Sequence, residues 1–489
     1  MDTTIIFASE VPAATISDRV RRGQLVRLAT GVYTTDVTSD RAVVVLREWY
    51  QIVGKMFPRA VITDRSATTG GPVEGRLYLS HDGRSREVQL PGLTVLARTG
   101  AGPLDDDIAL PGGLYQASKG RALAENTRPS RSRNGHVRRT LDEAELGDWV
   151  DRLCQVDGPR QLSRYREKAE EVAEVVGAPA EGVRRLSQMI GSALGTNQLR
   201  TASRALAARQ AALPYDQDRI HRFNRLIAGL RASAPQNRPV QDLRHPRYRY
   251  LPFFEAYFSN FIEGTEFVLD EAIAVVYDGR QIPGRGDDSH DLLGTYKVVS
   301  DLDSMSTLAL TPDEFLELLR SRHATIMGGR PDKRPGFFKD AVNRAGDSVF
   351  VLPGLVAGTL RSGWDMLGEL DTAFERAVYV MFLVSEAHPF DDGNGRLARV
   401  MMNAELVAGM QSRIIVPTVF RDDYLGGLRR MTRQDDPSVL IKALRFGHDY
   451  TAQVRYADLE ETTDILLATN AFNEPDSEQR LLLPSSLGL

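Results

Sequence analysis

Four side chains within the stretch HPFDDGNGRLAR, residues 388–399, have the types and spacing needed for chemistry on a phosphate ester. His388 is a base whose charge changes near neutral pH. Asp392 offers the hard oxygen that Mg²⁺ prefers. Arg396 and Arg399 are three residues apart, so a helix beginning here would carry both on one face of its first turn. These parts can hold a nucleoside triphosphate and deprotonate an incoming hydroxyl.

The three residues that follow Asp392 can supply the main-chain half of such a site. Gly393 and Gly395 allow positive φ and a close backbone approach, and Asn394 lies between them. Consecutive N–H groups of this kind form a concave site for phosphate oxygens. The alternative is a polar glycine-rich loop in which His388 only caps a helix. The joint occurrence of base, carboxylate, glycines and arginines favours the phosphate site.

Two helices must position this loop. The run DTAFERAVYVMFLVSEAH has apolar residues at helical spacing and predicts a largely buried helix. Pro389 disfavours α geometry at the residue before it, so the helix should end at His388 and turn its imidazole toward the loop. The run GRLARVMMNAELVAG predicts a second helix, whose positive N-terminal end would point at the same anion.

The stretch resembles the HxFx(D/E)GNGRxxR motif of Fic-domain proteins at every defined position. The resemblance implies a mainly α fold and the transfer of AMP from ATP to a Ser, Thr or Tyr hydroxyl of a protein. His388 is then the general base, Asp392 binds Mg²⁺, Arg399 reaches the γ-phosphate and Phe390 anchors the loop. The resemblance assigns the remaining phosphate contacts to Gly393, Asn394, Gly395 and Arg396.

Gly395 bears on which group is transferred. Kinase-like relatives in the family carry Lys at this position, so the glycine favours AMP transfer over phosphorylation. Phosphocholine transfer is also known in the family, and this loop leaves that reaction open. Tyr424, in RDDYLGGL, falls where the family often has a residue beside the adenine.

A second motif lies upstream, in FSNFIEGTEF. Ser259 and Glu263 are four apart and share a helical face, and Gly264 suits a helix C-terminus. The segment resembles the (S/T)xxxE(G/N) inhibitory helix of many Fic proteins, here at 255–264. The resemblance implies that Glu263 pairs with Arg399 and blocks the seating of the γ-phosphate. In some relatives the same glutamate supports AMP removal, which remains an alternative. The other interpretation of Glu263 is an ordinary surface carboxylate.

Residues 344–359, RAGDSVFVLPGLVAGT, predict two short strands around Pro353-Gly354. Fic proteins carry a flap here, and an extended segment of a target protein could pair with its exposed backbone. The resemblance allows self-modification and leaves a homodimer open. A simple surface hairpin is the alternative. Upstream, the Gly-, Pro- and Asp-rich stretch Asp278–Asp291 predicts a loop.

The N-terminal part has a different pattern. Residues Ala13–Tyr33 predict a helix, a turn and a strand, and RVRRGQLVRLATGVYTT resembles the winged helix-turn-helix of AbiEi-type antitoxins. The resemblance implies DNA binding, with arginines on phosphates; the alternative is a solvated helix face. The residues that follow, including FPRAVITDRSATTGG, resemble the mixed α/β part of that family.

The whole chain has 489 residues, which is long enough for several domains. The expected parts are a winged-helix-like region (1–60), a mixed α/β region (61–140), a helical connector (141–212), the Fic domain (213–460) and a tail (461–489). The formal net charge of −4 gives no overall bias toward polyanions. A single cysteine, Cys154, is typical of a reducing compartment. With no signal peptide and no long apolar run, we expect a cytoplasmic protein outside the membrane.

Two other functions remain open from the residues alone. A DNA-binding regulator could use the Fic domain as a nucleotide sensor. The second alternative is a toxin and its antitoxin fused in one chain, because both halves of the chain resemble components of toxin–antitoxin pairs.

Overall fold

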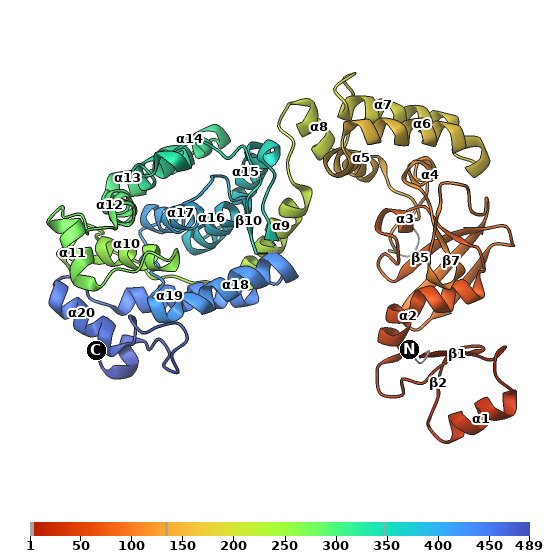
Figure 1. The fold of residues 1–489 in the computed structure, drawn as a ribbon, viewed down its shortest axis with the longest axis horizontal. Coiled ribbons are helices and arrows are strands. Elements are labelled where there is room, and N and C mark those ends of the chain that lie inside the picture. The colour runs from red at the N-terminus through yellow and green to blue at the C-terminus, as the bar shows by residue number, and fades with distance from the viewer. Residues whose placement is uncertain (1–3, 133–134, 347) are drawn as a thin grey trace. The chain divides into compact units, whose positions relative to one another are not determined.

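The computed structural model describes residues 4–132, 135–346 and 348–489 (Figure 1). The chain divides into two compact units, Met1–Ala212 and Leu213–Leu489. Helices dominate the described residues, with smaller sheets in the first unit, so the predicted mainly α fold is confirmed. Within the described ranges, no helix has the length and apolar character that crossing a membrane requires.

The first unit begins with a small antiparallel sheet in the order β1-β3-β2. Its elements are β1 (Ile5–Phe7), α1 (Ala13–Arg21), β2 (Val26–Ala29) and β3 (Val32–Thr34). A helix-turn-helix needs two consecutive helices, whereas α1 leads directly into β2. The winged-helix prediction is therefore not confirmed in the described residues, and DNA binding by this region stays a prediction.

A six-stranded mixed sheet follows, in the order β6-β7-β5-β4-β9-β8. Its strands are β4 (Val61–Ile62), β5 (Arg76–His81), β6 (Arg86–Leu90), β7 (Leu93–Thr99), β8 (Ile108–Ala109) and β9 (Tyr115–Gln116). Central β5 and β7 run parallel, with Leu79 opposite Ala97, while β6 pairs with β7 antiparallel. The helix α2 (Arg41–Met56) shares their core through Val45, Ile52 and Val53.

The rest of the first unit is helical and has its own core. Its helices are α3 (Ser66–Thr69), α4 (Lys119–Glu125), α5 (Glu143–Asp157), α6 (Pro159–Val176), α7 (Ala180–Ala193) and α8 (Arg204–Gln210). A capping box at Asp142 and Glu145 starts α5 by satisfying otherwise unpaired backbone N–H groups. Cys154 on α5 is buried in this core, where it packs as a small apolar residue.

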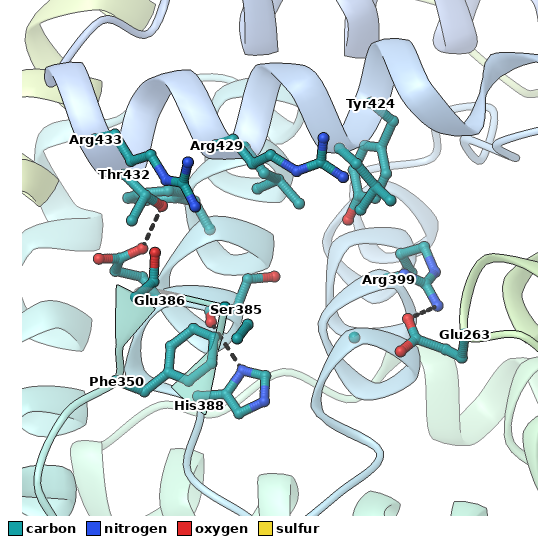
Figure 2. A pocket seen from close by; sticks show the side chains of 17 residues that line it. Glu263, Phe350, Ser385, Glu386, His388, Arg399, Tyr424, Arg429, Thr432 and Arg433 are labelled. Atoms are coloured by element: carbon teal, nitrogen blue, oxygen red, sulfur yellow. Dashed lines mark hydrogen bonds and ion pairs between the residues drawn. The ribbon is translucent and has the colours of Figure 1, made fainter. Parts of the chain in front are cut away.

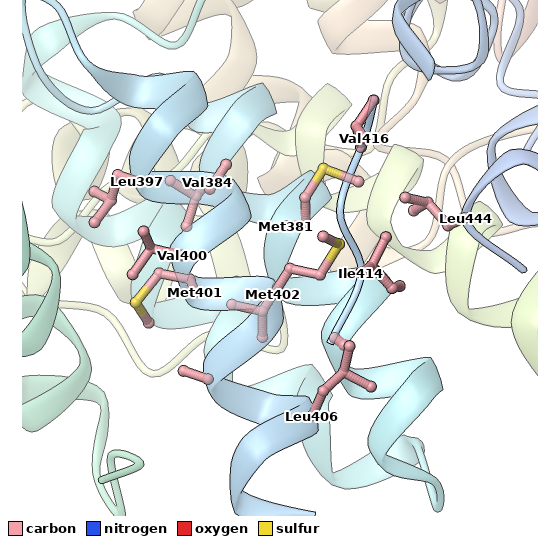
Figure 3. Packing of buried hydrophobic residues seen from close by; sticks show 14 of the residues in the cluster. Met381, Val384, Leu397, Val400, Met401, Met402, Leu406, Ile414, Val416 and Leu444 are labelled. Atoms are coloured by element: carbon pink, nitrogen blue, oxygen red, sulfur yellow. The ribbon is translucent and has the colours of Figure 1, made fainter. Parts of the chain in front are cut away.

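Two buried helices form the centre of the second unit: α16 (Ala373–Ala387) and α17 (Asn394–Ala408). Apolar residues of α16, including Met381 and Val384, gather with Leu397 and Val400 of α17 in one core (Figure 3). A helix that is apolar on nearly all sides is stable only when buried, and most of both helices is. Because α16 ends at Ala387, one residue before His388, the proline-directed stop is where the sequence predicts it.

The surrounding helices complete that core. They are α9 (Gln217–Ala232), α10 (Leu251–Ile262), α11 (Leu269–Tyr277), α12 (Gly286–Ser300), α13 (Leu302–Ser306), α14 (Pro312–Ile326), α15 (Val356–Asp365), α18 (Arg421–Gln434), α19 (Ser438–Gln453) and α20 (Leu459–Ala468). The expected tail at 461–489 instead starts inside α20. Beyond that helix, Ala471 and Leu481 are buried in the common core, so apolar burial holds this segment against the unit.

The predicted hairpin is present but lies earlier than expected. Strands β10 (Arg344–Ala345) and β11 (Ser348–Val349) pair antiparallel, and both precede Pro353. Pro353 instead opens a short 3₁₀ helix that leads into α15, because its fixed φ suits the first turn of a helix. Part of the expected loop at Asp278–Asp291 is likewise helical, since α12 starts at Gly286.

Candidate active site

A short loop joins α16 to α17, and its shape depends on unusual backbone angles. His388 and Gly393 both have positive φ, +48° and +71°. A Cβ at position 393 would lie 2.6 Å from the sulfur of Met327, so only glycine fits without movement. Asn394 closes the loop: its Nδ2 donates to the carbonyl of Phe390 and its Oδ1 accepts from the N–H of Phe390, each at 2.9 Å. The Asn394 side chain is thus committed to the loop.

A histidine that the motif does not contain supports this loop from α14. The rings of His323 and Phe390 stack with centroids 3.7 Å apart, and Phe390 is fully buried. The Nδ1 of His323 accepts from the N–H of Gly336 at 2.9 Å, so its Nε2 carries the proton and donates to the carbonyl of Asp392 at 2.9 Å. Burial lowers the pKa of His323 to about 4, which keeps this support neutral.

His388 is held as a neutral imidazole with one nitrogen free. Its Nδ1 lies 3.3 Å from the carbonyl of Ser385, which can only accept, so Nδ1 is the donor and Nε2 keeps its lone pair (Figure 2). Burial lowers the pKa of His388 to about 4, and the positive charge of Lys339 adds to this. The Ser385 carbonyl and the carboxylates of Glu263 and Asp392 act in the opposite direction. An imidazole in this state can accept a proton at neutral pH.

A cavity of about 510 Å³ opens beside His388. It is bordered by the start of α17 at Gly395 and Arg399, by Glu263, and by the hairpin (Figure 2). Successive turns of α18 line another side of the cavity. Their lining residues are Tyr424, Leu425, Leu428, Arg429, Thr432 and Arg433. The volume is in the range of small-molecule sites. Tyr424, which the resemblance associates with the adenine, is buried and lines this cavity.

The residues of the second motif meet the first motif at Arg399. Glu263 lies just beyond α10, and its Oε1 is 2.7 Å from the Nη2 of Arg399. Arg399 also donates from Nε to the hydroxyl of Ser259 at 2.9 Å and from Nη2 to the Ser259 carbonyl at 2.8 Å. Gly264 follows with φ of +88° and ends the helix. Segments 136 residues apart in sequence thus converge on one guanidinium.

This pair is asymmetric in exposure. The Arg399 side chain is 5% exposed, whereas that of Glu263 is 29% exposed at the cavity. Burial tends to lower the pKa of Arg399, but the Glu263 carboxylate and Tyr424 together outweigh it, so that pKa is raised. The same carboxylate lies against the main chain of Gly395, because a Cβ added there would clash with it. Glu263 therefore fills the space directly over the first turn of α17.

Arg396 is placed differently from Arg399. It is buried, its Nη1 lies 2.5 Å from the Oδ2 of Asp291 on α12, and it donates weakly to Asn260 at 3.3 Å. Asp291 is shared with Arg330 at 2.7 Å, and the Nε of Arg396 has no partner in the described structure. Arg396 would have to exchange these contacts to reach a phosphate, so its predicted phosphate contact stays a prediction.

Asp392 is the one motif carboxylate suited to a cation. Its Oδ1 accepts from the N–H of Gly393 at 2.7 Å. Among the described residues there is no cluster of three or more His, Cys, Asp or Glu able to hold a metal. Mg²⁺ does not need such a cluster, because one carboxylate with substrate phosphates and water can complete its shell. The donor set fits Mg²⁺ that arrives with a nucleotide.

Three important neighbours were not singled out by the sequence: His323, Asp291 and Phe350, whose ring stacks on His388 with centroids 3.7 Å apart. Each acts through contacts made only after folding, and none belongs to a local pattern. Asp291 also lies in the Gly-, Pro- and Asp-rich stretch that predicts a loop, where an acidic residue gives no sign of a role in the site.

Part of the chain is similar to known proteins. Residues 311–406 match the model of the Fic/DOC family, so the chain contains a Fic domain. Over 249 residues it is 26% identical to a protein adenylyltransferase Fic of Nematostella vectensis, covering 48% of this chain and 56% of that protein. It is 25% identical over 274 residues to the protein of that name in Drosophila willistoni, covering 54% and 53%. The chain thus spans about half the length of these curated relatives.

A solved structure of Fic-1 from C. elegans is also similar, at 16% identity. The similarity covers 67% of this chain and 90% of that one, with a TM-score of 0.38.

Proposed function

We propose that this chain is a protein adenylyltransferase that moves AMP from ATP to a Ser, Thr or Tyr hydroxyl of a protein. One observation carries the proposal: His388, whose Nδ1 is held by the Ser385 carbonyl, lines a cavity that Arg399 and Gly395 of the first turns of α17 also line. A base beside a cationic site for phosphates is what the reaction requires. The names of the curated relatives support the same reaction.

The bond changes follow from that placement. The target oxygen attacks the α-phosphorus of ATP while its proton passes to Nε2 of His388. The bond from the α-phosphorus to the bridging oxygen breaks, and pyrophosphate leaves. Phosphoryl chemistry of this kind depends mainly on positioning and on stabilisation of charge. Mg²⁺ held at Asp392 would neutralise charge on the phosphates.

The chain's own groups would hold the phosphates through main-chain donors and one strong cation. The N–H groups of Asn394 and Gly395 lie in the first turn of α17 and that of Gly393 lies at its N-cap, where the helix dipole favours an anion. The N–H of Gly393 would first have to leave Oδ1 of Asp392. Arg399 supplies a planar guanidinium for the terminal phosphate, once Glu263 has left it. The target protein is proposed to pair with the hairpin at β10 and β11, and one of the enzyme's own hydroxyls is proposed as a second acceptor.

In this proposal Glu263 is an inhibitor. Its carboxylate pairs with the Arg399 guanidinium that would otherwise bind the γ-phosphate. It also occupies the space over Gly395. ATP and Glu263 then compete for one guanidinium, which makes the wild-type enzyme slow.

The decisive experiment is labelling with α-³²P-ATP and Mg²⁺, comparing wild type with Glu263→Gly. The substitution removes a charge-assisted pair worth about 1.5–3 kcal/mol, which ATP must otherwise displace from Arg399. Labelling should therefore rise about tenfold or more. Glu266→Gly is the matched control, because Glu266 is exposed and close in sequence but touches neither Arg399 nor the cavity. Absence of protein-bound label in folded Glu263→Gly, with the chain itself and with lysate as acceptors, would overturn the proposal.

A further inference from the structure

The hairpin contributes one aromatic ring to the site. Phe350 follows β11, and its ring lies flat on the imidazole of His388, with centroids 3.7 Å apart and planes inclined by 6°. At this separation the two faces are in van der Waals contact. A quarter turn of the imidazole about its Cβ–Cγ bond would drive ring atoms into Phe350. The stack therefore restricts the orientation of the base.

One side of the hairpin is tied to the loop just after His388. Asn343 donates from Nδ2 to the carbonyl of Phe390 at 2.9 Å, and its own carbonyl accepts from the N–H of Phe350 at 3.3 Å. The buried Lys339 strengthens this tie by donating from Nζ to Asn343 Oδ1 at 2.6 Å. The segment after β11 that carries Phe350 is thus fixed to Phe390, two residues beyond the base.

The other side is tied to the helix just before His388. Arg219 donates from Nη2 to the carbonyl of Val349 at 2.6 Å, and its Nε lies 2.9 Å from Oε1 of Glu386. Glu386 is buried and is also held by Arg222 at 2.5 Å and by the hydroxyl of Thr432 at 2.7 Å. Two independent ties therefore flank the base, at residues 386 and 390, with the aromatic stack between them.

We infer that Phe350 is a positioning residue for His388, so that the hairpin fixes the catalytic base as well as offering an edge to the target. The ring keeps Nδ1 on the Ser385 carbonyl and leaves Nε2 toward the cavity. For its catalytic consequence this inference rests on the proposed AMP transfer. Its structural content, an imidazole held and covered by Phe350, stands on the stack and the two ties.

The pKa of His388 distinguishes a positioning role of Phe350 from a passive one. Loss of a surface ring without contact to His388 would leave that pKa unchanged. Besides the Phe350 ring, the groups that face His388 are the Ser385 carbonyl, the Lys339 ammonium and the carboxylates of Glu263 and Asp392. Loss of the ring leaves these in place and admits water. Because burial is the main cause that lowers the pKa of His388, its removal should let that pKa rise toward the ordinary histidine value.

The test compares Phe350→Ala, Phe350→Leu and Phe350→Tyr, each in the Glu263→Gly background. We expect kcat to fall about tenfold to a hundredfold in Phe350→Ala, with the KM for ATP within about threefold, since loss of orientation affects the reaction more than binding. Phe350→Tyr should restore the rate because it keeps the flat ring. Phe350→Leu keeps apolar volume without a flat face and should fall between them. Phe337→Ala is the matched control, because Phe337 is an exposed phenylalanine outside the cavity.

The His388 titration is followed separately by NMR on the same full-length variants. We expect a rise of at least about one unit in Phe350→Ala and none in Phe337→Ala. An unchanged His388 pKa, or a kcat equal to or above that of the parent, would overturn the inference. If Glu263→Gly itself labels no protein, the proposed function fails, and the titration alone then decides whether Phe350 holds the base.

Discussion

His388 combines low basicity with a fixed tautomer. Its burial beneath Phe350 and its bond to the Ser385 carbonyl leave Nε2 unprotonated over most of the pH range. A base of this kind accepts a proton only as the attacked phosphorus draws electrons from the hydroxyl. In the proposed reaction such a base would contribute to the transfer and little to the binding of ATP.

The variant His388→Ala tests that division. We expect AMP transfer in the Glu263→Gly background to fall by about 10²–10⁴-fold, the usual contribution of a general base. The Kd for ATP should change by less than about threefold, because the proposed phosphate contacts lie at other residues. Isothermal titration with ATP and Mg²⁺ measures binding, and labelling measures transfer. The exposed His221, replaced by Ala, is the control; full activity of His388→Ala would refute the assignment of the base.

The pH dependence follows from the same burial. Transfer needs neutral His388, whose pKa is lowered to about 4, so kcat/KM of Glu263→Gly should be level from pH 8 to about pH 5 and fall below that. The measurement is initial labelling rate against pH. An acid limb near pH 6.5 would mean that the imidazole is solvated in the working enzyme.

The residues of both motifs could be predicted from sequence because each pattern is local. A proline fixes the end of α16, and spacing puts Ser259 and Glu263 on one face. The partner of Arg396 could not be predicted in this way. It depends on Asp291, more than 100 positions upstream, and on the tertiary packing that brings α12 against α17.

At the scale of elements, the active-site loop is only as firm as its support from α14. His323 supplies a flat contact to Phe390 and bridges two backbone groups, at Gly336 and Asp392. Through His323, the loop between α16 and α17 is attached to α14, a helix that contains no residue of either motif.

His323→Ala should therefore damage both stability and the loop. It leaves a cavity beside Phe390 and removes the partner of two backbone groups, so the free energy of unfolding should fall by about 2–4 kcal/mol. Urea unfolding followed by circular dichroism measures the loss. His323→Gln, which can keep one hydrogen bond but not the stack, should lie between wild type and Ala. A loss under about 0.5 kcal/mol in His323→Ala would contradict the supporting role.

Elements were predictable where periodicity was strong and were missed where context decides. The apolar runs of α16 and α17 predict buried helices, and both are buried. The hairpin is too short for its pattern to fix the turn, and Pro353 suits a helix start as well as a turn. The helix, turn and strand predicted for Ala13–Tyr33 are present as α1 and β2, and Val26–Ala29 pairs with β3.

At the scale of the molecule, the second unit contains three histidines that are neutral because they are buried. They are His323, His388 and His448, and the pKa of each is lowered to about 4. In the unfolded chain each would titrate near 6.5, so unfolding takes up protons between pH 6.5 and 4. Their contribution to stability is complete above about pH 6.5 and is lost as the pH falls toward 4.

Thermal unfolding of the full chain should show this dependence. We expect the transition of the second unit to move to lower temperature between pH 7 and pH 5, with each imidazole contributing up to about 1.4 kcal/mol per pH unit. His448→Gln keeps a donor for the Ser412 carbonyl but cannot titrate, so its melting temperature should depend less on pH. Equal pH dependence in wild type and His448→Gln would show that His448 is not buried as a neutral group.

The contact between Glu263 and Gly395 has a consequence for the history of the sequence. A side chain at position 395 and the seated carboxylate of residue 263 cannot occupy the same space. The two positions should therefore change together among related chains: where 395 gains a side chain, the glutamate should be lost or its helix displaced. Selection that keeps the inhibitory glutamate at position 263 would then keep glycine at position 395, and with it the type of reaction that this position favours.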